Sequence, residues 1–295
     1  MRIEEFADLA VSRVKEKMGM GVTVSSKCVR KNNGVILHGI EIAEKGSNIA
    51  PCIYLDGWHD RYEAGEDIEI IMDGIIRSFE DGRKRAMPDI SDFENFEAVR
   101  GKIYGRLVNT EKNAEVLTDI PNRAFLDLSL IYCVVLSIGE EVGSIMVRNS
   151  HMEAWGVSED DLYREAMSNM ETADDAIIKS FTEIMKEMAG DGLPLCPDSF
   201  PMYVLTNRCK VNGAVEITRK DVLEKAAEIM GCDFMVIPSS VHEVLLVPDN
   251  RNPKQAAQIA GMVDEVNRTQ VAEDEVLSFH VYRYSRRDGG LSVAA

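Results

Sequence analysis

The sequence lacks the glycine-rich loops that most often indicate a bound nucleotide. Neither G-x-x-x-x-G-K-[ST] nor G-x-G-x-x-G after an expected strand occurs in its 295 residues. Such loops place backbone N–H groups around phosphate oxygens. We therefore find no indication of ATPase or dinucleotide chemistry, and we expect no cofactor.

Paired cysteines of the metal-binding kind are also missing. The six cysteines contain no C-x-x-C pair and no short Cys/His spacing of the zinc-site type. They are Cys28, Cys52, Cys133, Cys196, Cys209 and Cys232. We interpret them as reduced and mostly buried thiols, and we expect no metal site.

Long apolar runs are absent as well. The longest, Leu126 to Ile138, is interrupted by Asp127 and is too short to cross a bilayer as a helix. The opening residues, Met1 to Phe6, carry two glutamates where a secretion signal needs a basic region and an apolar run. We expect a cytoplasmic protein without a membrane segment.

Positive charge is scarce. The chain has 33 Lys and Arg against 50 Asp and Glu, a formal net charge of -17. The densest basic groups, at 83–85 and 283–287, are not interleaved with aromatics, whereas binding to nucleic acid needs several phosphate contacts together. We expect no direct nucleic-acid binding, and a basic protein partner fits the acidic surface better.

The first hundred residues predict a helix, a hairpin, a strand and a second helix. Ile3 to Met18 has apolar residues at helical spacing, and Asn33-Gly34 joins two strands as a tight turn. Glu66 to Lys84 has the spacing of an amphipathic helix. We treat residues 1–100 as the first region.

A strand-rich middle region, 101–192, follows. It contains expected strands at Ala124 to Ser137 and Val142 to Arg148 and a helix capped by Ser158. The segment from Glu171 to Met188 is also interpreted as helical. Hairpin plus helix recurs later in the chain, so a weak internal duplication and a chance resemblance both stay open.

The last region, 193–295, has the element order βαββαβ. Strands are expected at Met202 to Asn207, Asp233 to Pro238, Glu243 to Pro248 and Leu277 to Tyr284, with helices at Arg219 to Gly231 and Pro253 to Asn267. This order predicts a ferredoxin-like unit. The fold class is therefore α+β, with antiparallel sheets covered by helices on one face.

Several segments resemble a known family. They are Met1 to Phe6, Ile53-Tyr54-Leu55-Asp56, Ile120 to Leu128 and Val236 to Glu243. Over nearly the whole chain the sequence resembles the uncharacterised gut bacterial family labelled domain of unknown function 5688. The second half is more faintly similar, in element order, to the YtpQ-like bacterial proteins. Neither resemblance implies an activity, a cofactor or a catalytic residue.

Two polar clusters are candidate binding sites. The first, Trp58, His59 and Asp60, follows an expected strand and could hold a general base or a metal, or could simply anchor a turn. The second, Asn149, His151 and Trp155, lies where a strand leads into a helix, a common place for binding residues. Packing explains each cluster equally well or better.

Other polar segments favour structural roles. Ser239, Ser240 and His242 lie at an expected hairpin turn without the strand-to-helix elbow of a serine nucleophile. The acidic stretches at 63–97 and 159–191 are typical of solvated helix faces.

The sequence thus favours a non-catalytic interaction or regulatory module that binds a basic protein partner. One alternative is a metal-dependent hydrolase using His59 or His151 with nearby carboxylates. Another is an acidic mimic of nucleic acid, which requires carboxylates in rows on one face.

Overall fold

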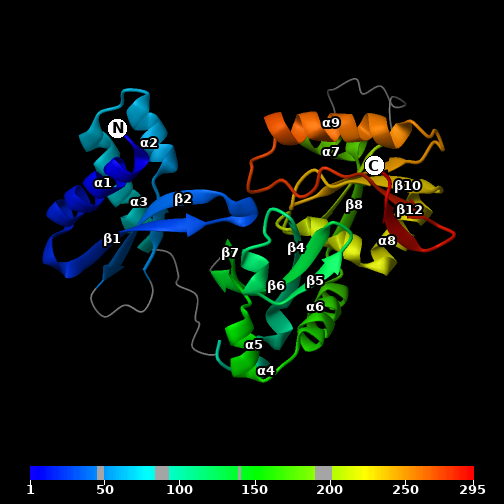
Figure 1. The fold of residues 1–295 in the computed structure, drawn as a ribbon, viewed down its shortest axis with the longest axis horizontal. Coiled ribbons are helices and arrows are strands. Elements are labelled where there is room, and N and C mark those ends of the chain that lie inside the picture. The colour runs from blue at the N-terminus through cyan, green and yellow to red at the C-terminus, as the bar shows by residue number, and fades with distance from the viewer. Residues whose placement is uncertain (45–49, 84–92, 139–140, 190–200) are drawn as a thin grey trace. The chain divides into compact units, whose positions relative to one another are not determined.

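The computed structural model describes residues 1–44, 50–83, 93–138, 141–189 and 201–295 (Figure 1). Contacts between Cα atoms divide the chain into two compact units. The first is Met1–Asp89 with Ser137–Val142, and the second is Ile90–Leu136 with Gly143–Ala295. None of the described helices is both long enough and apolar enough to span a membrane.

The first unit packs helices on a three-stranded antiparallel sheet of order β1-β2-β3. Its elements are α1 (Ile3–Met18), β1 (Val22–Arg30), β2 (Ile36–Glu44), β3 (Cys52–Tyr54), α2 (Asp56–Glu63) and α3 (Ile68–Arg83), with short 3-10 turns at Gly19–Gly21 and Asn32–Gly34. Asn33 and Gly34 have φ angles of 58° and 76°, the left-handed conformation that the hairpin turn requires. The expected opening helix and Asn-Gly hairpin are confirmed.

Apart from the ends of β6 and β7 within Ser137–Val142, which cluster with the first unit, the second unit begins with a four-stranded sheet of order β4-β6-β5, and β7 also pairs with β6. Its elements are α4 (Phe96–Val99), β4 (Ile103–Asn109), β5 (Asn122–Phe125), β6 (Leu128–Ile138), β7 (Glu141–Met146), α5 (Asn149–Trp155) and α6 (Glu159–Ala173), with 3-10 turns at Arg100–Lys102 and Val116–Thr118. Ser158 caps α6 by accepting a hydrogen bond from the Asp161 N–H, as the sequence predicts.

A six-stranded antiparallel sheet of order β13-β12-β10-β11-β9-β8 completes the second unit. Its strands are β8 (Ala176–Ser180), β9 (Tyr203–Asn207), β10 (Phe234–Ile237), β11 (Val244–Pro248), β12 (Tyr282–Ser285) and β13 (Gly290–Val293). The helices are α7 (Phe181–Ala189), the 3-10 helix η6 (Gly213–Thr218), α8 (Lys220–Met230) and α9 (Gln255–Thr269). The protein is therefore an α+β protein.

The expected ferredoxin-like unit, with both helices on one face, is wrong. The first half fits, because β11 lies between β9 and β10, the two strands that α8 connects. The last strand, β12, pairs with β10 instead of with β9 on the opposite edge. The connections β9-α8-β10 and β11-α9-β12 cross the sheet in the same direction, but they start from strands that are antiparallel to each other. Because both connections are right-handed, α8 and α9 lie on opposite faces of the sheet.

Burial along the strands agrees with this arrangement. Phe234 and Val236 of β10 belong to the core beneath α8, while Met235 between them packs with Ile259 and Val263 of α9. Figure 1 shows α8 and α9 on the two sides of the strands. The predicted order of helices and strands was correct. The architecture differs because β12 pairs with β10 and not with β9.

One hydrophobic core joins the middle and C-terminal parts of the chain. Leu107 of β4, Tyr132 of β6, Ala166 of α6 and Phe234 of β10 belong to the same buried cluster. The division at residues 101–192 and 193–295 remains a prediction about sequence regions. The two sheets of the second unit nevertheless share their packing.

A buried ion pair lies inside this unit. Glu216 of η6 is 1% exposed and Arg219 is 5% exposed. The Arg219 guanidinium lies 3.2 Å from the Glu216 carboxylate, donates to the Met170 carbonyl oxygen at 2.9 Å and to Asp221 at 2.6 Å. Burial raises the pKa of Glu216 to about 7, against the opposing effect of Arg219.

This pKa predicts a pH-dependent loss of stability. Because folded Glu216 holds its proton to higher pH than the unfolded side chain, its contribution is present below about pH 4.5 and is lost as pH rises through about 7. In Glu216→Gln that loss disappears. From about pH 5 to about pH 8, the free energy of unfolding of the variant should therefore rise by about 2 kcal/mol relative to that of the unsubstituted protein. Urea denaturation at a series of pH values measures this change.

The exposed Glu228 of α8 supplies the matched control. The difference in free energy of unfolding between Glu228→Gln and the unsubstituted protein should stay constant over the same pH range. A Glu216→Gln difference that is equally flat would contradict a raised pKa for Glu216.

Candidate functional site

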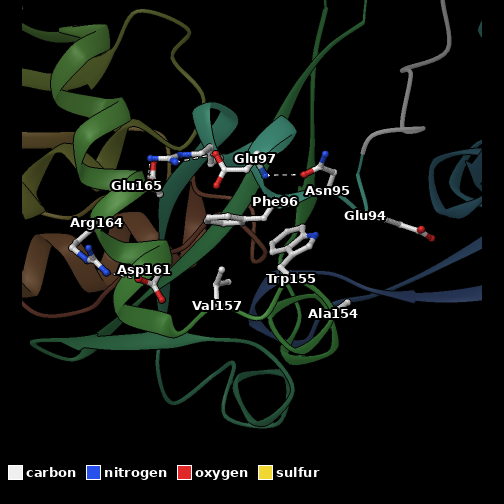
Figure 2. A pocket seen from close by; sticks show the side chains of 11 residues that line it. Glu94, Asn95, Phe96, Glu97, Ala154, Trp155, Val157, Asp161, Arg164 and Glu165 are labelled. Carbon is white, nitrogen blue, oxygen red and sulfur yellow. Dashed lines mark hydrogen bonds and ion pairs between the residues drawn. The ribbon is translucent and has the colours of Figure 1, made fainter.

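A polar pocket of about 680 Å³ lies in the second unit, between the chain around α4 and the helices α5 and α6 (Figure 2). Side chains from three separate segments form its walls. They are Glu94, Asn95, Phe96, Glu97 and Arg100, then Ala154, Trp155 and Val157, and finally Asp161, Arg164 and Glu165. Its volume is in the range of small-molecule and peptide side-chain sites.

Two aromatic rings lie in the middle of the pocket (Figure 2). Phe96 and Trp155 have ring centroids 5.8 Å apart and are tilted by 46°. The Trp155 indole N–H donates to the Phe93 carbonyl oxygen at 3.0 Å, which fixes the ring orientation. Helix α5 ends directly after this residue because Gly156 adopts the left-handed conformation, with φ of 68°.

Charged side chains surround the aromatic pair. Arg100 bridges Glu97 at 3.0 Å and Glu165 at 2.8 Å. Arg164 forms an ion pair with Asp161 on the neighbouring turn of α6. The lining therefore contains four carboxylates and two guanidinium groups, so the pocket carries an excess of negative charge.

Hydrogen bonds stabilise the ionised forms of Arg100 and Asp161. The bond from Arg100 to Glu97 is the main cause that raises the pKa of the guanidinium. The Ser158 hydroxyl, with the Ser158 N–H, lowers the pKa of Asp161. The pocket therefore offers aromatic faces beside fixed negative charge, an arrangement that attracts a cation.

Of the second predicted cluster, the structure places Trp155 in the lining of the pocket, which includes neither Asn149 nor His151. All three lie in α5 rather than in a loop. Asn149 donates to the Thr118 carbonyl oxygen at 3.2 Å, so its amide holds the start of the helix. His151 accepts from the Arg148 N–H at 3.1 Å and packs edge-on against Phe93. Burial, with a smaller contribution from Arg148, lowers the pKa of His151.

The first predicted cluster belongs to the first unit and begins α2. A Cβ atom on Gly74 of α3 would lie 2.6 Å from the Trp58 indole, so the two helices meet at this contact. His59 Nε2 lies 2.8 Å from the Met1 carbonyl oxygen, and its ring packs against Phe6. Asp60 is exposed. These contacts give Trp58 and His59 packing roles.

The histidines have separate surroundings. His242 accepts from the Asn212 N–H at 3.2 Å, and neighbouring Ser240 donates to Glu243 at 2.8 Å, as in a turn held by its side chains. The residues that contact His59 and His151 are different from those that contact His242. Across the described ranges, no group of three or more His, Cys, Asp or Glu residues could hold a metal ion.

Sequence reasoning missed most of the pocket. The acidic stretches around Glu94 and Asp161 were interpreted as solvated helix faces, yet they supply facing walls of one cavity. Phe93 and Phe96 at a spacing of three within an acidic segment were the available signal. Their meeting with Trp155, about 60 positions later, depends on the packing of α4 and α5.

Comparison with known proteins identifies the family. The model of a family of unknown function, DUF5688, matches residues 3–286. The chain belongs to this family. Neither a curated protein nor a solved structure matches the chain. This match confirms the resemblance to domain of unknown function 5688, whereas the gut origin and the similarity to YtpQ-like proteins stay predictions.

Proposed function

We propose that this protein is a non-catalytic, cytoplasmic bacterial interaction module, with a regulatory role, and that its polar pocket holds a basic segment of a protein partner. The observation that carries the proposal is the pairing of Phe96 and Trp155 with an excess of carboxylates in one cavity. A lysine or arginine side chain entering there would meet both an aromatic face and negative charge.

The charge of the whole chain supports the same partner. A net charge of -17 attracts basic surfaces over distances of about a Debye length and speeds their encounter. The pocket adds a place where a cation is partly removed from water, which strengthens its attraction to the aromatic rings. None of the residues that the structure describes forms an ion pair with Glu94, so its carboxylate is available to an incoming cation without breaking an existing bridge.

Replacing Trp155 by leucine tests this proposal. Leucine keeps apolar bulk and removes the aromatic face, so affinity for a short lysine- and arginine-rich peptide should fall about tenfold. Isothermal titration calorimetry on the full chain measures the affinity. Binding by the unsubstituted protein should also weaken as salt is added.

Two controls separate the pocket from the general acidity of the chain. Glu94→Gln should weaken binding, whereas Glu228→Gln on the exposed face of α8 should have little effect. An acidic peptide of equal length should not bind. Equal affinity of the Trp155→Leu and unsubstituted proteins for the basic peptide would contradict the proposed site.

A further inference from the structure

A cysteine and a histidine lie opposite each other in the sheet of the first unit. Cys28 of β1 pairs with His38 of β2 in the antiparallel register. The backbone of His38 bonds toward β3, because its carbonyl oxygen accepts from the Leu55 N–H at 2.7 Å and its N–H donates to Asp56 Oδ2 at 2.9 Å. Cys28 and His38 are therefore a non-hydrogen-bonded pair, the type in which opposite side chains are closest, with Cα atoms about 4.5 Å apart.

Asp56 orients the imidazole of His38. One carboxylate oxygen, Oδ2, holds the His38 backbone, and the other, Oδ1, lies 3.5 Å from Nδ1 of the ring. Nδ1 is buried and makes no hydrogen bond within the described part of the chain, so Asp56 is the acceptor it faces. With the proton on Nδ1, the basic nitrogen of the neutral imidazole is Nε2. A base held by a carboxylate thus lies beside a thiol.

The surroundings of Cys28 favour a nucleophilic thiol. Cys28 is exposed and belongs to β1, which is at one end of the strand order β1-β2-β3. β1 contains two cations, Lys27 and Arg30, and no acidic residue, although the chain as a whole is acidic. Nearby cations favour the thiolate, and exposure gives a reactant access to it. Rotation about the Cα–Cβ bond of Cys28 turns the sulfur toward the His38 ring.

We propose that Cys28 is a site of reversible exchange with a low-molecular-weight disulfide, that His38 is its base, and that Asp56 positions His38. His38 Nε2 takes the proton of the thiol, and the Cys28 sulfur attacks one sulfur of the disulfide. The S–S bond of the reactant breaks as the new S–S bond forms, and the leaving thiolate takes the proton from His38. The product is a mixed disulfide on Cys28, which a low-molecular-weight thiol reverses by the same steps.

The groups present match disulfide exchange better than acyl transfer. Attack on a carbonyl carbon develops charge on oxygen and depends on donors placed for that oxyanion. Disulfide exchange develops charge only on sulfur, so a nucleophile, a base and access are sufficient. Cys28, His38 and the exposed strand β1 supply these three. The mixed disulfide therefore reports the oxidation state of the surrounding small thiols.

Cys209 is the matched internal control. It is also exposed and also lies beside two cations, Arg208 and Lys210, but it belongs to a turn and has no histidine opposite it in a sheet. The probe is dipyridyl disulfide, a neutral aromatic disulfide, and peptide mass spectrometry on the full chain follows each cysteine over time. At neutral pH we expect Cys28 to react about tenfold faster than Cys209. A Cys28 rate no higher than that of Cys209 overturns the proposal.

A His38→Gln variant tests the base. It should slow the reaction of Cys28 about tenfold or more at neutral pH and leave Cys209 unchanged. At high pH, where thiols ionise without a base, the variant and the unsubstituted protein should react at the same rate, which a purely structural role of His38 would not produce. An unchanged Cys28 rate at neutral pH in His38→Gln overturns the assignment of His38.

Two further measurements complete the test. Asp56→Asn should slow Cys28 severalfold, whereas Asp8→Asn on the exposed face of α1 should leave its rate unchanged. Cys52 of β3 is partly buried in the same sheet, so a rise in its rate reveals unfolding of the first unit. If a variant unfolds by this measure, the comparison of Cys28 with Cys209 in the unsubstituted protein decides.

Discussion

Replacing Arg219 by methionine is expected to lower the free energy of unfolding of the second unit by about 3–5 kcal/mol. The substitution leaves the buried Glu216 carboxylate without its cationic partner and the Met170 carbonyl oxygen without the hydrogen bond from Arg219. Methionine preserves the apolar length of the side chain, so the loss reports mainly on charge and hydrogen bonding.

Urea denaturation followed by Trp155 fluorescence measures this effect. A Trp58→Phe background leaves Trp155, which lies in the second unit, as the sole indole. The control is Arg268→Met on α9, because Arg268 forms an exposed ion pair with Asp264 and should change stability little.

A double substitution distinguishes a buried charge from lost packing. Adding Glu216→Leu to Arg219→Met removes the stranded carboxylate and should recover part of the lost stability. If the single variant loses no more stability than Arg268→Met, Arg219 is not a buried partner of Glu216.

Gly213→Ala is expected to destabilise the second unit by about 3 kcal/mol or more, at the upper end of overpacking effects. A Cβ atom at this position would lie 2.5 Å from the Asn207 backbone nitrogen and 2.6 Å from the His242 carbonyl oxygen. Both atoms belong to backbone and cannot rotate away. The first turn of η6 would have to move away from β9.

Gly261 offers a control within the same unit. It lies in α9 with open space around its Cα, so Gly261→Ala should stabilise the helix by about 0.5–1 kcal/mol. The same fluorescence-monitored denaturation applies to both variants. Similar stabilities for Gly213→Ala and Gly261→Ala would show that η6 and β9 do not approach as closely as the structure has them.

Local patterns predicted several elements well. The spacing of Phe6, Ala10 and Val14 predicted α1, and these side chains are buried. Asn33-Gly34 predicted the hairpin, because the left-handed backbone angles of a tight turn favour these two residue types. Both features depend on neighbouring residues, so the sequence contains the information directly.

The structure of other segments depends on contacts with distant parts of the chain. Ala176 to Ser180 was included in an expected helix and forms strand β8, whose every residue pairs with β9. The polar and acidic residues from Glu171 through Asp175 into Lys179 suggested a helix, but pairing with the open edge of β9 makes this segment a strand. The sequence predicted one strand that includes Phe125 and Leu128. In the structure these residues belong to two strands, β5 and β6, and Leu126, with a φ of 58°, lies in the turn between them.

The sequence by itself determined the α+β class, most helices and strands, the acidic character and the family. Those properties follow from composition and from contacts within a few residues. Tertiary structure alone decided that β12 pairs with β10, that α8 and α9 cover opposite faces, and that Phe96, Trp155 and Glu165 share one pocket. Each of these depends on which strand edge or helix face meets a distant segment, and a local pattern leaves that choice open.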